Sequence, residues 1–176
     1  GDVVGIDTAV HAGKVMAEAY PDRMQFSDDN PMGVMAGLER YGQKNLKGFY
    51  RYEMDKRGKP RKYPDPEADA IVAGLVGEPR EVTDQEIIDR MMIPMINESV
   101  RCLEDNIVDT AMEVDLGLIY GLGFPPFRGG ALKYADAVGL KELCEKAAAH
   151  GRLGKLYEPP ALLREMADSG KNFYPF

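Results

Sequence analysis

The sequence has few of the residues that build covalent or metal-held scaffolds. Its 176 residues include two cysteines, two histidines and no tryptophan. Cys102 and Cys144 both lie in helical patterns and could be bridged only if the fold brought them together. We therefore expect a reduced pair in a cytoplasmic protein, and no metal site, because no Cys/His cluster is present.

Several functional signatures are also missing. No apolar run approaches the roughly 20 residues of a membrane span, and no secretory signal precedes the folded part. There is no Walker motif and no GxSxG sequence. Gly121-x-Gly123 follows a helical pattern rather than a strand, so it is not a dinucleotide fingerprint. Neither His11 nor His150 pairs with an acid in a recognisable pattern, and we expect no catalytic, cofactor-binding or metal-binding residue in this chain.

Positive charge is in short supply as well. The chain has 29 acidic and 22 basic residues, a net charge of −7. This balance argues against nucleic acid or an anionic membrane as a general partner. An anionic small ligand would need local bases, of which Arg128 and Lys133 are examples.

What the sequence does have is helical periodicity. Almost no stretch alternates at period two, whereas apolar residues recur at helical spacing, so we predict an all-α fold. The longest predicted helix covers Asp84–Asn106 and starts from a capping box formed by Thr83 and Glu86. Pro94 lies inside it, at a typical cost of about 3 kcal/mol. Because the apolar stripe continues in phase, we expect one kinked helix rather than two.

The stretch Thr110–Gly130 organises the second half of the chain. It begins as a helix with a second capping box, completed by Glu113, and two glycines end that helix. The stiff loop Phe124–Phe127 follows, with two prolines between two aromatic rings, and then Arg128. A rigid aromatic loop that ends in one arginine suits an apolar ligand with an anionic part. The alternative is a helix–loop–helix corner whose rings belong to the core.

Two short sequences occur twice and in the same order. Asp2–Ile6 recurs as Asp136–Leu140, and each copy leads into a helix. Lys47–Tyr50 recurs as Lys171–Tyr174, after a further helix in each copy. The matching order favours an internal duplication.

The duplication predicts three parts. Residues 1–53 form the C-terminal half of a first helical repeat that is truncated at its N-terminus. Residues 54–82 form a loop or linker with a short helix, because prolines, Gly58 and many bases leave little to bury. Residues 83–176 form a complete second repeat.

The runs MMIPMINESVRCLEDNIV, TAMEVDLGLIYGLGFPPFRGG and GQKN…GFYRY resemble the helical C-terminal region of 3-hydroxyacyl-CoA dehydrogenases. The resemblance is strongest to the α-subunits of bacterial multifunctional fatty-acid β-oxidation complexes and covers almost the whole chain. It implies a longer protein with an enoyl-CoA hydratase/isomerase part, a Rossmann domain that binds NAD, two tandem helical repeats and a thiolase β-subunit as partner. The family's catalytic residues fall outside this chain.

The resemblance also implies that Tyr120 touches the acyl-CoA substrate. The stiff aromatic loop that ends in one arginine makes Phe124 and Arg128 further candidates for substrate binding. A tyrosine has a ring for packing and a hydroxyl for one hydrogen bond. The alternative is a core tyrosine with a satisfied hydroxyl. For the basic run Lys56–Lys62 we expect a solvated loop, and contact with CoA phosphates or with acids of a partner is the other possibility.

Two functions follow. The first is the substrate-side and assembly region of an NAD-dependent L-3-hydroxyacyl-CoA dehydrogenase, inactive when alone. The second is a helical dimerisation or domain-packing module that makes no direct contact with substrate.

Overall fold

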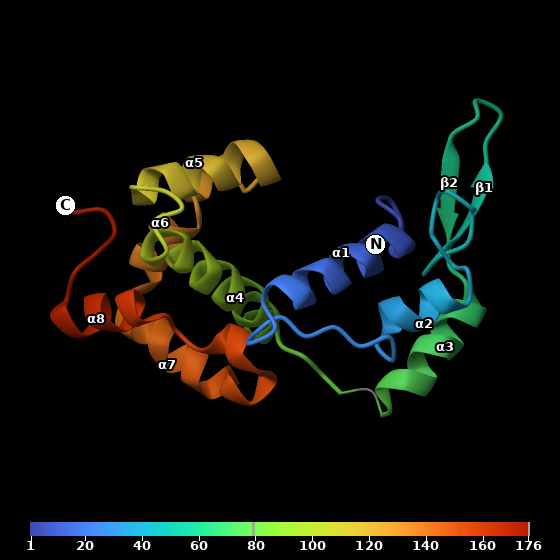
Figure 1. The fold of residues 1–176 in the computed structure, drawn as a ribbon. Helices are drawn as coiled ribbons and strands as arrows, with labels where there is room; N and C mark the ends of the chain where they lie inside the picture. Colours follow the sequence, from blue (N-terminus) through green and yellow to red (C-terminus); the bar gives the residue numbers. More distant parts are fainter. Residues whose placement is uncertain (79, 176) are drawn as a thin grey trace. The chain divides into compact units, whose positions relative to one another are not determined.

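The computed structural model describes residues 1–78 and 80–175 and divides the chain into two compact units, Gly1–Glu81 and Val82–Phe176. Among the described residues there are eight α-helices and one two-stranded sheet (Figure 1). The predicted helical fold is therefore confirmed, with one small hairpin added. None of the helices in the described ranges is both long and apolar enough to cross a membrane.

The first unit contains three helices and the hairpin. The helices are α1 (Ile6–Ala19), α2 (Pro31–Gly37) and α3 (Pro66–Val76), and the antiparallel strands are β1 (Arg51–Met54) and β2 (Pro60–Tyr63). Helices α2 and α3 both start with an Asn or Asp cap followed by proline, a sequence that favours helix initiation. The core of this unit is small and consists of Ile6, Val10, Met35 and Ala68, with partly buried neighbours.

One buried arginine ties α3 to the rest of the first unit. Arg40 is 1% exposed, and its guanidinium donates to the Gly48 carbonyl over 3.0 Å and to Glu67 over 2.9 Å. It also bonds the Asp65 carboxylate, and this contact holds the pKa of Asp65 below its usual range despite partial burial. A buried guanidinium needs such partners, so this end of α3 is fixed by charge as well as by apolar packing.

Residues 54–82 thus differ from the linker that we expected. They contain the short helix α3, but they also complete the hairpin, and most of them belong to the first unit. The hairpin pairs Arg51 with Tyr63 and Met54 with Pro60. Its strands are four residues long and rich in charge, so alternation in the sequence is too short to reveal them.

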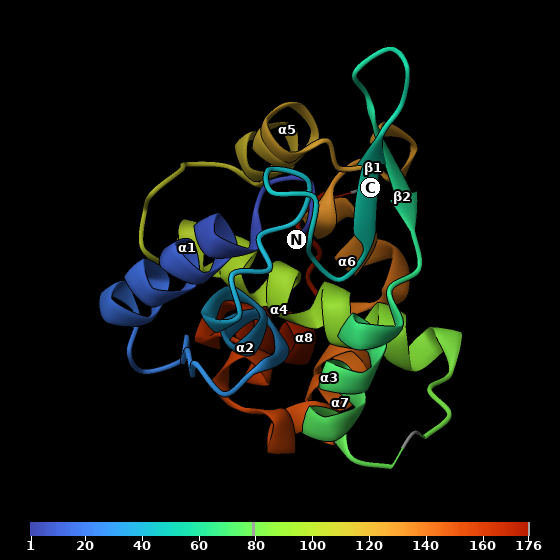
Figure 2. The same cartoon turned by 90° about the vertical axis from the view of Figure 1, so that its right-hand side faces the viewer.

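The second unit has five helices: α4 (Asp84–Glu104), α5 (Ala111–Leu122), α6 (Ala131–Val138), α7 (Leu140–His150) and α8 (Ala161–Ser169). Helix α4 contacts the other four (Figure 2). Three short 3-10 turns complete the unit, at Pro126–Arg128, Gly151–Leu153 and Lys155–Tyr157. The larger core of this unit draws on every helix: Ile93, Ile96, Val100, Val114, Ala131, Leu132, Ala135, Leu140, Leu143, Ala147 and Leu163.

Helix α4 is continuous through Pro94, as predicted. Only its second half, from Ile93 onward, is buried in the core. Ile87, Ile88 and Met91 are 51%, 42% and 68% exposed. The sequence predicted a broad apolar face for the whole helix, but the described residues of this unit cover only the C-terminal part.

Candidate functional site

The α5 helix and the loop after it begin as the sequence predicts. The Thr110 hydroxyl accepts the Glu113 amide over 3.2 Å, and a Glu113 carboxylate oxygen accepts the Thr110 amide over 2.9 Å. Hydrogen bonding to Thr110 lowers the pKa of Glu113. At the other end Gly123 takes the left-handed conformation, with φ of 72°, and the chain turns into the Pro-Pro loop.

A buried carboxylate of α5 binds the far end of that loop, where α6 begins. Asp115 is 2% exposed and accepts the amides of Leu132 and Lys133, at the start of α6, over 2.9 and 3.0 Å. It also accepts the Tyr174 hydroxyl over 2.8 Å. Gly130 has φ of 110°, and a Cβ there would lie 2.1 Å from the Asp115 carboxyl carbon. Asp115 therefore closes the loop between α5 and α6.

No motif in the sequence predicts that Asp115 is a buried hydrogen-bond acceptor. The local sequence gives one signal: Asp115 stands between two apolar residues, Val114 and Leu116. An acidic residue is unexpected at such a position of a half-buried helix. Burial first, and then the hydrogen bond to Asp115, raise the pKa of the Tyr174 hydroxyl, so it keeps its proton further into the alkaline range than an exposed tyrosine.

The three candidate binding residues lie in different environments. Tyr120 is 85% exposed, so no part of the described residues buries its ring. Phe124 is partly buried and packs against the core of the second unit. Arg128 is exposed, with its guanidinium carbon 5.4 Å from the Phe127 ring centre and 5.9 Å from that of Tyr134. The loop thus places the Arg128 guanidinium beside the rings of Phe127 and Tyr134.

Helix α5 and its loop expose an apolar surface. Met112 and Leu116 precede Tyr120 at four-residue intervals, so all three lie on one face of the helix. They are 58% and 44% exposed, and the Phe127 ring is 83% exposed. We call these residues, together with Leu122, the α5 surface. On the inner side of α5 Asp115 bonds the start of α6 and Tyr174, and on the outer side no described residue covers this surface.

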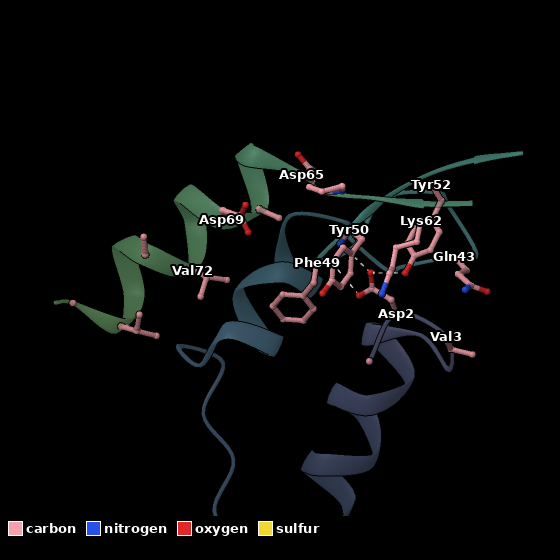
Figure 3. A pocket seen from close by; sticks show the side chains of 16 residues that line it. Asp2, Val3, Gln43, Phe49, Tyr50, Tyr52, Lys62, Asp65, Asp69 and Val72 are labelled. Atoms are coloured by element: carbon pink, nitrogen blue, oxygen red, sulfur yellow. Dashed lines mark hydrogen bonds between the residues drawn. The ribbon is translucent and has the colours of Figure 1, made fainter. Parts of the chain in front are cut away.

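An open groove of about 1050 Å³ lies in the first unit, beside α3 and the hairpin (Figure 3). At its base is Asp2, which is 8% exposed. Its carboxylate accepts the Phe49 and Tyr50 amides and the Tyr52 hydroxyl, each over 3.0 Å. Burial, and then Asp2, raise the pKa of Tyr52 to about 12.

The same contact recurs in the second unit. Asp136 accepts the Phe173 and Tyr174 amides, both over 2.9 Å. A lysine lies over the second ring in each unit: the Lys62 ammonium is 4.4 Å from the Tyr50 ring centre, and Lys133 is 5.0 Å from that of Tyr174. The two repeated sequence motifs therefore form the same pair of hydrogen bonds in each unit.

The described residues carry little reactive chemistry. Within them no three His, Cys, Asp or Glu side chains gather as metal ligands would. Both cysteines are free thiols, and burial raises the pKa of Cys102 and of Cys144, which disfavours the nucleophilic thiolate.

Comparison with known proteins identifies the domain. The family model described as 3-hydroxyacyl-CoA dehydrogenase, C-terminal domain, matches residues 1–52 and 87–173. The chain belongs to this family. The resemblance read from the sequence is thereby confirmed.

The relatives of this dehydrogenase domain are considerably longer. The fatty acid oxidation complex subunit alpha of Pseudomonas paraeruginosa is 56% identical over 173 residues, which cover 98% of this chain and 24% of that protein. The same subunit of Ectopseudomonas oleovorans is 54% identical over the same shares. The chain therefore spans about a quarter of the length of these relatives.

A solved structure supports the fold of the dehydrogenase C-terminal domain. The dehydrogenase part of multifunctional enzyme 1 from C. elegans aligns with a TM-score of 0.59 at 19% identity, over 93% of this chain and 36% of that one. The family match leaves out residues 53–86. Strand β2, the hairpin turn and α3 lie in that interval, so they are additions to what the family model describes.

Proposed function

We propose that this chain is the substrate-side and assembly region of an NAD-dependent L-3-hydroxyacyl-CoA dehydrogenase. The longer protein would be an α-subunit that also carries enoyl-CoA hydratase activity, works in the cytoplasm and binds a thiolase β-subunit. Family membership and the names of the relatives support this proposal. Residues 1–53 and 83–176 would then be the truncated first repeat and the complete second repeat of that protein, joined through 54–82.

NAD would be held outside this chain. A dinucleotide cradle needs a glycine-rich turn between a strand and the start of a helix. Here Gly123 ends α5 instead, and the described strands are confined to the hairpin. The residues present therefore do not fit the cofactor, which we assign to the Rossmann and hydratase-bearing remainder of the longer protein.

The exposed side chain of Tyr120 is the observation that carries the proposal. Tyr120 lies in the last turn of the capped helix α5, and the stiff loop after that helix is fixed by Asp115 and packed through Phe124. Its ring and hydroxyl are both available, so Tyr120 can pack on an acyl chain and donate one hydrogen bond. Phe124 would support that contact, and Arg128 would provide positive charge for the anionic part of acyl-CoA.

A second function also has an observation behind it. Met112, Leu116, Leu122 and Phe127 make the α5 surface apolar well beyond Tyr120. Exposed apolar patches of this kind mark contact surfaces. On this alternative, the surface packs against another domain or subunit and touches no substrate.

The Tyr120→Phe variant of the longer protein separates the two functions. Loss of one neutral hydrogen bond is worth about 0.5–1.5 kcal/mol, so we expect kcat/KM for 3-hydroxyacyl-CoA to fall by about twofold to tenfold. The Tm should stay within a few degrees, because the ring remains and the hydroxyl is exposed.

Two controls accompany this measurement. The hydratase activity of the same variant should not change, and neither should the dehydrogenase kinetics of Tyr20→Phe, which alters another exposed tyrosine. The 176-residue chain alone should give no NADH turnover above the blank. Unchanged kinetics in Tyr120→Phe would favour the packing function instead.

A further inference from the structure

Positive charge is concentrated in one part of this acidic chain. Residues 44–62 contain eight of its 22 bases and only two of its 29 acids. This leaves 14 bases against 27 acids in the rest of the sequence. A polyanionic ligand is therefore repelled by most of the chain and attracted to this segment.

The hairpin presents its bases on a well-defined turn. Asp55 accepts the amides of Arg57 and Lys59 over 2.8 and 3.0 Å, and Gly58 takes a φ of 69° that favours glycine. These hydrogen bonds lower the pKa of Asp55. In both overall views the turn extends away from the helices of the first unit (Figure 1, Figure 2).

Internal ion pairs hold the two arginines of the strands, and Lys62 of β2 lies over the Tyr50 ring. Arg51 pairs with Glu53, and Arg61 pairs with Asp55 over 3.0 Å. Three exposed cations, Lys56, Arg57 and Lys59, make no side-chain hydrogen bond or ion pair within the part of the chain that the structure describes. We call these three the basic turn.

We propose that the basic turn binds the phosphate groups of acyl-CoA and brings the substrate to the protein. This inference rests on the proposed function, which makes acyl-CoA the substrate. CoA carries a diphosphate and a 3′-phosphate, and lysine and arginine are the side chains that bind such groups. Electrostatic steering of this kind raises association rates and weakens with salt.

The chemistry of the turn favours a small anion over a protein partner. The three cations are exposed, and Met54, 55% exposed at the end of β1, is the apolar side chain beside them. One such side chain is less than the apolar centre that protein interfaces need. The turn also lies within the interval that the family model leaves unmatched, so it is not part of the domain shared across the family.

The test compares two charge-removal variants of the longer protein. One carries Lys56→Gln, Arg57→Gln and Lys59→Gln, and keeps Asp55. The matched control carries Lys141→Gln, Arg152→Gln and Lys155→Gln, which removes the same charge from exposed positions of the second unit. The variants are assayed for KM and kcat with 3-hydroxyacyl-CoA over a range of ionic strength.

We expect the basic-turn variant to raise KM by about threefold or more at low salt, with kcat unchanged, and to match the parent near 0.5 M salt. The control should follow the parent throughout. Lys56→Arg with Lys59→Arg keeps the charge and should restore the parental KM, which separates charge from folding. Hydrogen exchange of residues 55–62 should slow when CoA is added to the parent protein.

Three results would overturn the inference. If both charge-removal variants have the same KM and dehydrogenase activity is intact, the basic turn does not bind acyl-CoA. The proposed function is not affected by that result. A basic-turn variant that loses a protein partner while its kinetics stay parental would assign the turn to an acidic protein surface. A longer protein that never turns over 3-hydroxyacyl-CoA would remove the proposed function, and the inference with it.

Discussion

In each unit one aspartate near the start of a helix binds two backbone amides of a later Phe-Tyr pair, but the tyrosine hydroxyls go to different carboxylates in the two units. Asp2 binds two backbone amides and the Tyr52 hydroxyl. Asp136 binds the two equivalent amides only, and the hydroxyl of Tyr174 goes to a second carboxylate, Asp115. The first unit thus places three donors on one acid, whereas the second spreads its donors over two.

The difference follows from what covers the repeated element. In the second unit α5 brings Asp115 to the hydroxyl of Tyr174. In the first unit the corresponding Tyr50 is 41% exposed and lines the groove. The two repeated sequences therefore pair with each other across 37 to 48 residues in each unit, and the neighbouring elements decide where the tyrosine hydroxyl goes.

Replacing Asp115 should give the largest effect of any single change discussed here. Asp115→Ala removes three hydrogen bonds to a buried carboxylate and leaves two helix-start amides of α6 without their acceptor. We expect the free energy of unfolding to fall by about 3–5 kcal/mol. Urea unfolding followed by circular dichroism measures it, with Asp115→Asn as the milder control. A loss under about 1 kcal/mol would show that the loop is held by packing alone.

The parts of the fold that sequence analysis predicted rest on short-range contacts. The capping box of Thr110 and Glu113 spans three residues, and the continuous helix through Pro94 follows from an unbroken apolar period. Both are local, so one window of sequence contains all the partners.

The features that it missed depend on distant partners. Asp115 meets Leu132 and Tyr174, which are 17 and 59 residues away, and no periodicity records such pairs. Tyr120 shows a related limit, because helical spacing placed it on the same face as Leu116 but could not say whether anything covers that face. In the described residues of the second unit the face is open.

The two matching aspartates provide the next test of the comparison. An asparagine has one oxygen acceptor, and its NH₂ group would face a backbone donor. Asp2→Asn should cost about 2–4 kcal/mol, because three donors share that carboxylate, and Asp136→Asn about 1–3 kcal/mol. Urea unfolding gives the order, and hydrogen exchange at the amides of Phe49 and Phe173 locates each effect. A greater loss for Asp136→Asn would reverse the ranking drawn from the contacts.

The smallest expected effects concern the tyrosine hydroxyls. Tyr52→Phe and Tyr174→Phe each remove one hydrogen bond to a carboxylate and should each cost about 1.5 kcal/mol. Tyr50→Phe is the matched control. Its ring still packs under Lys62, its hydroxyl makes no hydrogen bond within the described residues, and the change should stay within about 0.5 kcal/mol.

Alkaline pH sharpens this last test, because the pKa of Tyr52 is raised from 10.0 to about 12 in the folded chain. Below pH 10 the hydroxyl is protonated in both folded and unfolded states, and its contribution to stability is complete. Between about pH 10 and 12 the unfolded tyrosine loses its proton first, so the free energy of unfolding falls with pH, by up to about 1.4 kcal/mol per unit. Tyr52→Phe should flatten this fall in the first unit, whereas Tyr50→Phe should keep it. Equal slopes in the two variants would mean that burial and Asp2 together do not raise the pKa of Tyr52.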